Sequence, residues 1–316
     1  MGKILVTGAT GQIGTELVPF LRARYGKEEV VATGHRRKPD AHLLDGGPFA
    51  LLDVRDGKAL AALVGNHGIT TIYHLAGVLS ARGEADPKLA WDVNMNGLYS
   101  VLEVARLHGC AVFFPSSIAT FGPGSPQDFT PQDTIQRPRT IYGIAKLAGE
   151  LLCDYYHHRF GVDTRGVRYP GLISHAALPG GGTTDYAVEI FYGAIGEGRY
   201  CCPLRAETAL DMMYMADALR AAVELMEAEP ARLFHRNGYN LTAMSFTPEE
   251  LAGAIRRHIP GFSMEYAVDP VRQTIADSWP NRMDDSVARE EWGWRPGYDL
   301  AAMTAEMITR LVDKFG

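Results

Sequence analysis

The 316-residue sequence is poor in cysteine, has no long apolar run and carries no excess of basic residues. Its four cysteines, two of them adjacent, make a poor disulfide framework. No apolar run reaches the ~18 residues that a membrane-spanning helix needs, and the N-terminus lacks a signal-peptide hydrophobic stretch. From these absences we expect a reduced, cytoplasmic protein with no membrane partner.

The charge balance and the histidine and cysteine spacing exclude two further classes of partner. Lys and Arg number 31 against 37 Asp and Glu, a net charge of −6, so a broad footprint for nucleic acid is not expected. No Cys/His set has zinc spacing, so no metal is expected. Hydrophobic residues at 46% and charged residues at 22% are typical of a packed, globular enzyme.

Short apolar runs alternate with helical stretches through the first half of the chain. The expected strands are 3–7, 29–33, 50–53, 70–76, 111–116 and 162–169. The expected helices are 12–25, 59–66, 87–108 and 142–160. This alternation predicts an α/β fold with a doubly wound parallel sheet of the Rossmann type.

The pattern changes after Pro170, where a proline–glycine run at 179–182 breaks the chain. We therefore expect a dinucleotide-binding domain over 1–170 and a smaller, mainly substrate-binding lobe over 171–316. Within the lobe, helices are expected at 212–226, 248–258 and 300–315, and a strand at 238–242. The segment of about 208–242 is expected to return to the main sheet.

A glycine-rich loop follows the first expected strand and opens the first helix. Gly8, Gly11 and Gly14 are spaced by three residues each. In this context the first glycine permits a tight turn, the second lets backbone N–H groups approach a pyrophosphate, and the third allows close helix–strand packing. The loop predicts a nicotinamide dinucleotide site.

The end of the second strand leaves the choice between NAD and NADP open. A site for NAD usually has a carboxylate about 20 residues after the glycine loop, but residues 33–38 contain none. Arg36 and Arg37 would meet the 2′-phosphate of NADP, or they belong to a solvated basic loop. Asp53 and Val54 end the third strand, where they would contact the adenine edge; Asp53 would equally serve as a helix cap. We expect NAD, with NADP as the alternative.

Tyr142 and Lys146 lie four residues apart, on one face of an expected helix. Ser116 and Ser117 end the fifth strand, where catalytic side chains of open α/β sheets gather. A fixed cation favours the phenolate of a tyrosine, and a serine hydroxyl can donate to a substrate oxygen. These residues predict removal of a proton from an alcohol while a nicotinamide accepts the hydride.

Together these features resemble the extended short-chain dehydrogenase/reductases of the UDP-galactose-epimerase-like branch. Ser117 lies 25 residues before Tyr142, the offset of that branch. Residues 134–143, 171–187 and 278–294 are similar to the short-chain type of L-threonine 3-dehydrogenase. The resemblance implies oxidation of the β-hydroxyl of L-threonine by NAD to give 2-amino-3-oxobutyrate. It makes Tyr142 the general base, Lys146 the group that holds the ribose and lowers the pKa of the tyrosine, and Ser117 the group that orients the hydroxyl.

The same resemblance implies two sets of binding residues. The substrate set is Ser80, Ser116, Thr183, Thr184, Asp185 and Trp279. The cofactor set is Gly8, Thr10, Gly11, Gln12, Ile13, Gly14, His35, Arg36, Asp53, Val54, Leu75, Ala76, Gly77, Asn94, Tyr142, Lys146, Tyr169, Gly171 and Ile173.

Several alternatives stay open at this point. The same motifs serve a dehydrogenase of another β-hydroxy-α-amino acid, an NAD-dependent UDP-sugar 4-epimerase or a non-catalytic dinucleotide-sensing regulator. A homodimer through helices 87–108 and 142–160 is common in the family, and a monomer is the alternative. Leu147, Leu151 and Tyr155 would serve either that interface or an internal core.

Overall fold

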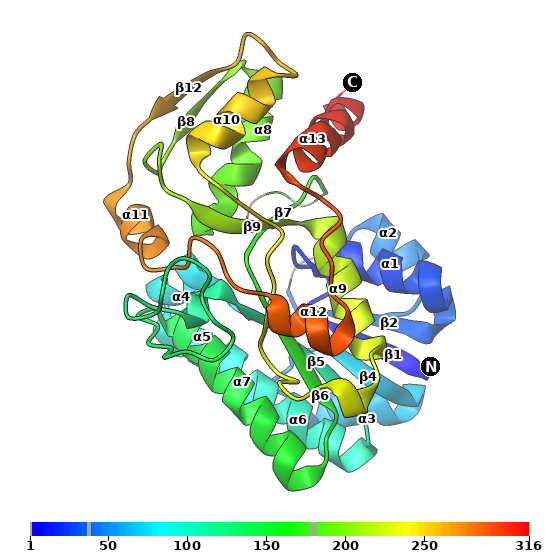
Figure 1. Cartoon of the computed structure of the whole chain (residues 1–316). Coiled ribbons are helices and arrows are strands. Elements are labelled where there is room, and N and C mark those ends of the chain that lie inside the picture. The colour runs from blue at the N-terminus through cyan, green and yellow to red at the C-terminus, as the bar shows by residue number, and fades with distance from the viewer. Residues whose placement is uncertain (1, 37–38, 177, 179, 181, 316) are drawn as a thin grey trace.

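The computed structural model describes residues 2–36, 39–176, 178, 180 and 182–315. The described residues form a main sheet of seven strands in the order β10-β6-β5-β4-β1-β2-β3, in which every neighbouring pair is parallel (Figure 1). The strands are β1 (Lys3–Thr7), β2 (Val30–Gly34), β3 (Phe49–Leu51), β4 (Ile69–His74), β5 (Ala111–Ser117), β6 (Thr164–Tyr169) and β10 (Tyr239–Asn240). The predicted Rossmann-type fold is confirmed.

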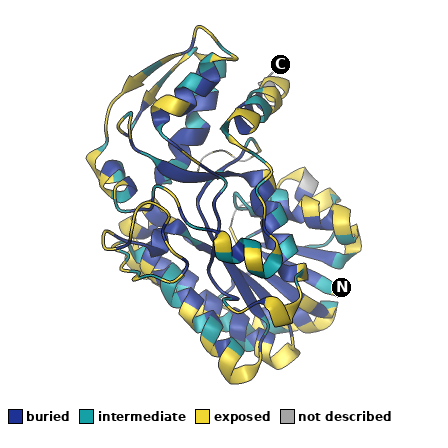
Figure 2. Cartoon of the chain, in the orientation of Figure 1, coloured by how far each residue is buried: buried dark blue, intermediate teal, exposed yellow. Residues whose placement is uncertain are grey.

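Helices cover both faces of this sheet because its strands are apolar on both sides (Figure 2). One face packs on α1 (Gly14–Tyr25), α2 (Ala41–Asp45) and α9 (Met215–Glu227). The other packs on α3 (Gly57–His67), α6 (Gly97–His108) and α7 (Ile141–Phe160). In β1, Ile4 and Val6 belong to the first core and Leu5 to the second. The sheet therefore holds the glycine loop and the start of α7 on one rigid frame.

A second region carries its own core around Phe191, Phe246 and Met303. Its strands are β7 (Gly171–Ile173), β8 (Arg199–Cys202), β9 (Leu210–Tyr214), β11 (Met244–Phe246) and β12 (Ser263–Tyr266), paired as β11-β9-β7 and β12-β8. Its helices are α8 (Tyr186–Gly196), α10 (Pro248–Arg256), α11 (Pro270–Ala276) and α13 (Leu300–Phe315). Among the described residues, no helix is both long enough and apolar enough to cross a membrane.

Two expected helices differ from the structure. The helix expected over 212–226 starts only at Met215, because Met212–Tyr214 belong to β9 and pair with β7 and β11. When an apolar run is continuous, its periodicity cannot distinguish a buried strand from a buried helix. The helix expected over 87–108 is divided into α5 (Pro87–Trp91), a π-helical stretch (Asp92–Asn96) and α6.

The segment 208–242 is shared between the two regions. Its last strand, β10, pairs with β6 in the main sheet, and α9 packs on that sheet. Its first strand, β9, belongs instead to the small sheet, with β7 and β11.

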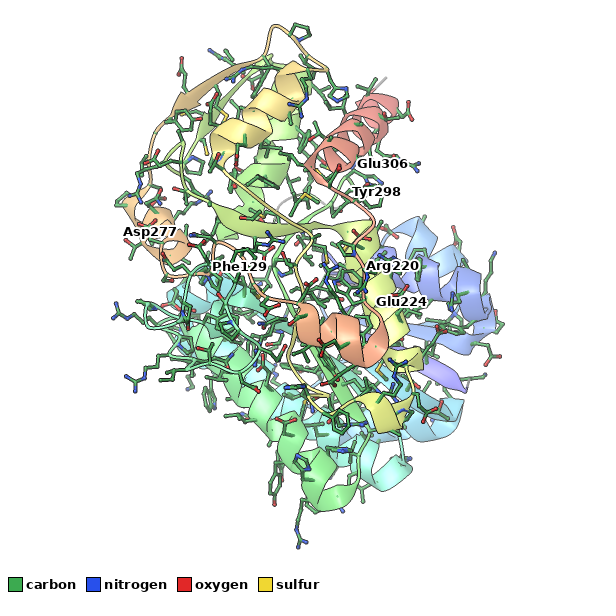
Figure 3. All side chains as sticks on the ribbon, viewed as in Figure 1. Phe129, Arg220, Glu224, Asp277, Tyr298 and Glu306 are labelled. Atoms are coloured by element: carbon green, nitrogen blue, oxygen red, sulfur yellow. The ribbon has the colours of Figure 1, made fainter. Side chains whose placement is uncertain are left out.

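After α12 (Ser286–Trp292) the chain returns to the second region, and on the way its backbone is hydrogen-bonded to Asp217 of α9. We call these bonds the Asp217 clamp. The buried Asp217 carboxylate accepts hydrogen bonds from the backbone N–H groups of Gly297 and Tyr298, at 2.9 and 3.0 Å. Figure 3 labels Arg220 and Tyr298 beside this crossing, and Arg220 pairs with Asp217 at 2.9 Å. The clamp fixes α13 relative to the main sheet.

The outer face of α7 carries apolar side chains that no internal core covers. Leu151 is 62% exposed and Tyr155 is 54% exposed, and Tyr99 of α6 is 53% exposed. Leu151 and Tyr155 therefore do not belong to an internal core, which decides one of the alternatives that the sequence left open.

Candidate active site

The glycine loop lies at the carboxyl end of β1, pressed against the end of β4. Gly8 has φ +68°, and a Cβ there would stand 2.6 Å from the backbone nitrogen of Ala76. A Cβ on Gly14 would stand 2.5 Å from the Gly8 carbonyl oxygen. Neither position has room for a side chain, so the tight turn and the close helix–strand packing both require glycine.

Two adjoining cavities open beside this loop. The first, of about 240 Å³, runs from the loop along the ends of β5 and β6 to Trp279, in the segment that follows α11. The second, of about 410 Å³, runs from the loop to the ends of β2 and β3. Gln12 lines both cavities, and its buried side-chain nitrogen has no hydrogen-bond partner among the described residues. An unpaired buried donor at a helix N-terminus fits a bound phosphate group.

The first cavity collects the predicted catalytic side chains on one wall. Ser117 ends β5, while Tyr142 and Lys146 occupy the first two turns of α7, which the Thr140 side chain caps. The Lys146 ammonium donates to the Pro115 carbonyl oxygen at 2.6 Å and lies 5.6 Å from the centre of the Tyr142 ring. The three groups expected to act together therefore line one cavity.

Burial dominates the titration of this pair. Desolvation raises the pKa of Tyr142 to about 12, and a hydrogen bond with Ser117 acts in the opposite direction. Desolvation likewise lowers the pKa of Lys146 to about 8, against the attraction of Glu150. In the described chain the tyrosine is thus a neutral phenol at pH 7, and its pKa lies above the ordinary value although a lowering by Lys146 was expected.

The predicted substrate residues also line the first cavity. Ser80 opens α4 (Ser80–Ala85), Trp279 follows α11, and both are buried to about the same degree. Thr183, Thr184 and Asp185 form a single 3₁₀ turn after the glycine run. The Asp185 carboxylate accepts from the backbone N–H of Gly182 at 2.6 Å, which fixes the turn against the cavity.

The second cavity is lined by six residues of the predicted cofactor set: Thr10, His35, Arg36, Asp53, Val54 and Ala76. The Asp53 carboxylate pairs with Arg55 at 2.6 Å and lies 3.6 Å from His35, and hydrogen bonds from Arg55 lower its pKa to about 2. Asp53 caps no helix here, since Asp56 caps α3. Arg37, the other arginine of this loop, lies outside the described residues.

The remaining predicted residues vary in their relation to the cavities. Asn94 and Ile173 line neither cavity; Asn94 holds the backbone of Val78 by two hydrogen bonds, and Ile173 lies in the core of the second region. Ser116 lines the first cavity, but its hydroxyl donates to Glu150. Tyr169 also lines the first cavity, and its hydroxyl donates to the Ala218 carbonyl oxygen at 2.6 Å. The other members of the cofactor set, Leu75, Gly77, Gly11, Ile13 and Gly171, line the first cavity.

Sequence reasoning missed several lining groups. Leu79 lines both cavities, Arg55 the second, and the Pro115 carbonyl oxygen holds Lys146. Arg55 could have been predicted from the sequence, since it follows Asp53 by two residues and carries the opposite charge. The role of a backbone carbonyl has no sequence signal, because every residue carries one.

Comparisons with known proteins agree with this geometry. The family described as NAD dependent epimerase/dehydratase matches residues 4–241. An uncharacterized epimerase/dehydratase of Staphylococcus haemolyticus is 53% identical over 99% of both chains. The structure of an L-threonine dehydrogenase from Clostridium difficile is 53% identical, covers 99% of this chain and 98% of its own, and superposes with a TM-score of 0.98. A monomeric L-threonine 3-dehydrogenase from a metagenome is 46% identical, covers 99% of this chain and 100% of its own, and has a TM-score of 0.95. The family resemblance inferred from the motifs is thereby confirmed.

Proposed function

The chain belongs to the NAD dependent epimerase/dehydratase family, and on that premise we propose that it oxidises the β-hydroxyl of L-threonine to 2-amino-3-oxobutyrate with NAD. The observation that carries the proposal is the wall formed by Ser117, Tyr142 and Lys146, in a cavity that begins at a dinucleotide-type glycine loop. The similarity to L-threonine dehydrogenases along the whole chain supports this substrate over a sugar nucleotide.

The residues around the glycine loop fit a dinucleotide. Gly8, Gly11 and the N-terminus of α1 would hold the pyrophosphate, and the unpaired Gln12 nitrogen would donate to it. Lys146 would hold the nicotinamide ribose. A bound nicotinamide would supply the acceptor for the hydride that leaves Cβ of the substrate.

The proton of the β-hydroxyl would pass to Tyr142. Ser117 would donate to the substrate oxygen and keep it beside the phenol oxygen, and the Lys146 ammonium would favour the phenolate. Loss of the O–H proton and of the Cβ hydride together forms the ketone. Because burial raises the pKa of Tyr142 to about 12, a charged Lys146 is essential for this step.

The amino-acid end of the substrate would meet the predicted substrate residues that line the same cavity. A carboxylate needs hydroxyl or backbone donors, which Ser80, Thr183 and Thr184 offer. The ammonium needs an acceptor, and the Asp185 carboxylate lines this cavity. Trp279 would cover the bound substrate.

We keep NAD as the cofactor because the ionised Asp53 carboxylate lines the same cavity as His35 and Arg36. There it would accept a hydrogen bond from a ribose hydroxyl and repel a 2′-phosphate. Arg36 argues for the phosphate, so the two cofactors must be compared directly.

The test is the absorbance of reduced nicotinamide, with purified protein, L-threonine, and NAD or NADP in parallel. An increase with NAD supports the proposal, and an increase with NADP alone keeps the chemistry but reassigns the cofactor. No increase with either would contradict threonine oxidation. Other β-hydroxy amino acids would then be assayed by the same absorbance. UDP-galactose would be assayed by the appearance of UDP-glucose, because a 4-epimerase returns the hydride to the sugar and leaves no reduced nicotinamide behind.

We propose that the enzyme acts in the cytoplasm and that it dimerises through the exposed apolar face of α6 and α7. Tyr99, Leu151 and Tyr155 form part of that face. Light scattering of Leu151→Glu beside the unmodified protein tests this: a dimer that becomes a monomer supports the interface, and a monomer in both contradicts it.

A further inference from the structure

A buried carboxylate lies one helical turn from the lysine of the active site. Glu150 follows Lys146 by four residues on α7, so the two side chains share a face of the helix. Glu150 is only 4% exposed, and its charge attracts the Lys146 ammonium. A charge this deep acts more strongly on its neighbours than a charge in water.

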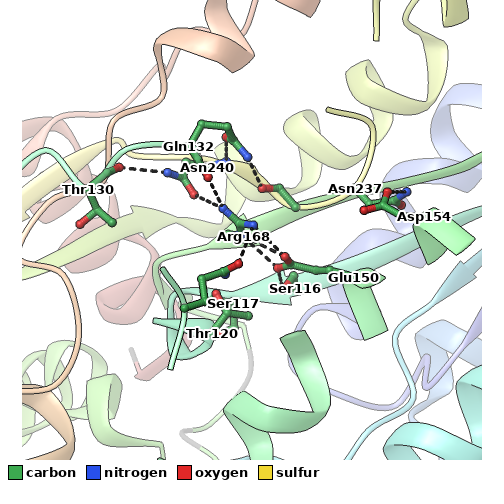
Figure 4. A network of polar contacts seen from close by, with 12 residues as sticks. Ser116, Ser117, Thr120, Thr130, Gln132, Glu150, Asp154, Arg168, Asn237 and Asn240 are labelled. Atoms are coloured by element: carbon green, nitrogen blue, oxygen red, sulfur yellow. Dashed lines mark hydrogen bonds and ion pairs between the residues drawn. The ribbon is translucent and has the colours of Figure 1, made fainter. Parts of the chain in front are cut away.

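The same carboxylate holds the end of β5. Glu150 accepts hydrogen bonds from the Ser116 hydroxyl and from Arg168, whose Nη2 is 2.8 Å from Oε2 (Figure 4). Ser116 stands between Pro115, whose carbonyl oxygen holds Lys146, and Ser117. A Cβ on Gly238 would stand 2.7 Å from Oε2, so backbone also closes on this carboxylate.

Arg168 connects this carboxylate to the segment that precedes α7. Its Nη1 donates to the Gln132 carbonyl oxygen at 2.9 Å and to Asn240 Oδ1 at 3.1 Å (Figure 4). Asn240 in turn donates to the Thr130 carbonyl oxygen at 3.1 Å. Every polar partner in this chain of contacts is internal, which fixes Glu150 relative to both β5 and the segment that precedes α7.

The other titratable groups around this pair do not replace the charge of Glu150. Burial lowers the pKa of His74 of β4 to about 3, and the nearby Lys146 charge acts in the same direction, so the imidazole is neutral. The Cys153 thiol is neutral, since burial raises its pKa, and Tyr142 is a phenol. Asp154 faces Glu150, but burial raises its pKa and its carboxylate accepts from Asn237 at 2.8 Å.

We propose that Glu150 is a positioning residue that keeps the Lys146 ammonium charged and fixed against the end of β5. It touches neither substrate nor cofactor, and acts through Lys146 alone. The proposal rests on the proposed function for its kinetic consequence, while the charge state of Lys146 is measured without any substrate.

The direct test follows the titration of Lys146 by NMR, with ¹³Cε-labelled lysine in the cofactor-free full chain. The chain has seven lysines, so the signal is assigned as the one that Lys146→Arg removes. In Glu150→Gln we expect the Lys146 midpoint to fall by about 1 pH unit, a tenfold easier loss of the proton. Ser116→Ala keeps the Glu150 charge, and we expect it to move the Lys146 midpoint by less than half of the shift seen in Glu150→Gln.

Glu150→Gln leaves Arg168 without its carboxylate and will fold less stably. The double variant Glu150→Gln with Arg168→Gln removes both charges and serves as the second test. Loss of the Arg168 cation acts on Lys146 in the opposite direction, so the midpoint should still fall in the double variant, but by less than in Glu150→Gln. An unchanged midpoint in either folded variant overturns the proposal.

The kinetic readout is the pH profile of kcat/KM for L-threonine. The productive pair has lost one proton, from Tyr142, and keeps the other on Lys146. In Glu150→Gln we expect the pH at which kcat/KM levels off to be about 1 unit lower. The value of kcat/KM on the plateau should fall about tenfold, while kcat/KM at low pH should change little. A uniform loss at every pH would indicate a merely structural role and overturn the proposal. A chain with no threonine activity but a shifted Lys146 midpoint would refute the proposed function alone.

Discussion

The two adjoining cavities form one cleft, and the ion pairs at its two ends differ in how far they are buried. At the catalytic end, the side chains of Glu150 and Arg168 are 5% and 7% exposed. At the adenosine end, Asp53 and Arg55 are 28% and 31% exposed, and Asp92 pairs with Arg55 at 40% exposure. Buried charges act through a low dielectric, whereas exposed ones are screened by water and salt. Substitutions at the catalytic end should therefore change the chemistry, and those at the adenosine end should change selectivity by small factors.

The largest effect is expected at Tyr142. Tyr142→Phe removes the proposed base while keeping the ring, so turnover with L-threonine should fall at least ~10²-fold, as for loss of a general base. Tyr155→Phe on the exposed face of the same helix is the matched control and should leave turnover unchanged. Steady-state reduction of nicotinamide measures both. Full activity in Tyr142→Phe would show that the base is elsewhere.

The pH dependence should follow the Tyr142–Lys146 pair. Burial places its first proton loss at about 8, on Lys146, and its second at about 12. The active form lacks one proton, so kcat/KM should rise about tenfold per unit below pH 8 and level off above it. The profile is measured with saturating cofactor at constant ionic strength. A rate that stays flat between pH 6 and 9 would contradict this pairing.

A smaller effect is expected at Arg36, in the exposed end of the cleft. If Arg36 contacts a 2′-phosphate, Arg36→Ala should lower kcat/KM for NADP about fivefold. It should change kcat/KM for NAD less than twofold. Arg199→Ala, at an exposed arginine of the second region, is the control. An unchanged NADP/NAD ratio would assign Arg36 to a solvated loop.

At the tight loop beside the cofactor site the expected change is in stability and not in turnover. Gly8→Ala forces a side chain into a left-handed backbone 2.6 Å from the Ala76 nitrogen, and should lower the free energy of unfolding by about 1–3 kcal/mol. Thermal unfolding measures it. Gly124→Ala is the control, since a Cβ there meets nothing within 4 Å.

The sequence predicted the parts of the molecule that depend on local signals. The strand 3–7 and the helix 300–315 have the expected bounds, and the capped helix that carries Tyr142 begins one residue earlier than expected. β9 was missed because a short buried strand and the start of a buried helix have the same apolar pattern.

The site shows the same division between local and tertiary information. The glycine loop and the tyrosine–lysine pair are motifs with fixed spacing, and both line the first cavity. The bond from Ser116 to Glu150 joins residues 34 positions apart, and no spacing rule predicts it. The high pKa of Tyr142 was also beyond the sequence, because it depends on how completely the fold removes water from the phenol.

Transfer of the hydrogen on Cβ tests the central claim most directly. L-threonine deuterated at Cβ would be incubated with the enzyme and NAD, and the reduced nicotinamide analysed by mass spectrometry. We predict that the reduced cofactor carries one deuterium and that 2-amino-3-oxobutyrate, or the aminoacetone formed from it, has lost that deuterium. Reduced cofactor without deuterium, or deuterium retained at Cβ after turnover, would contradict oxidation of the β-hydroxyl.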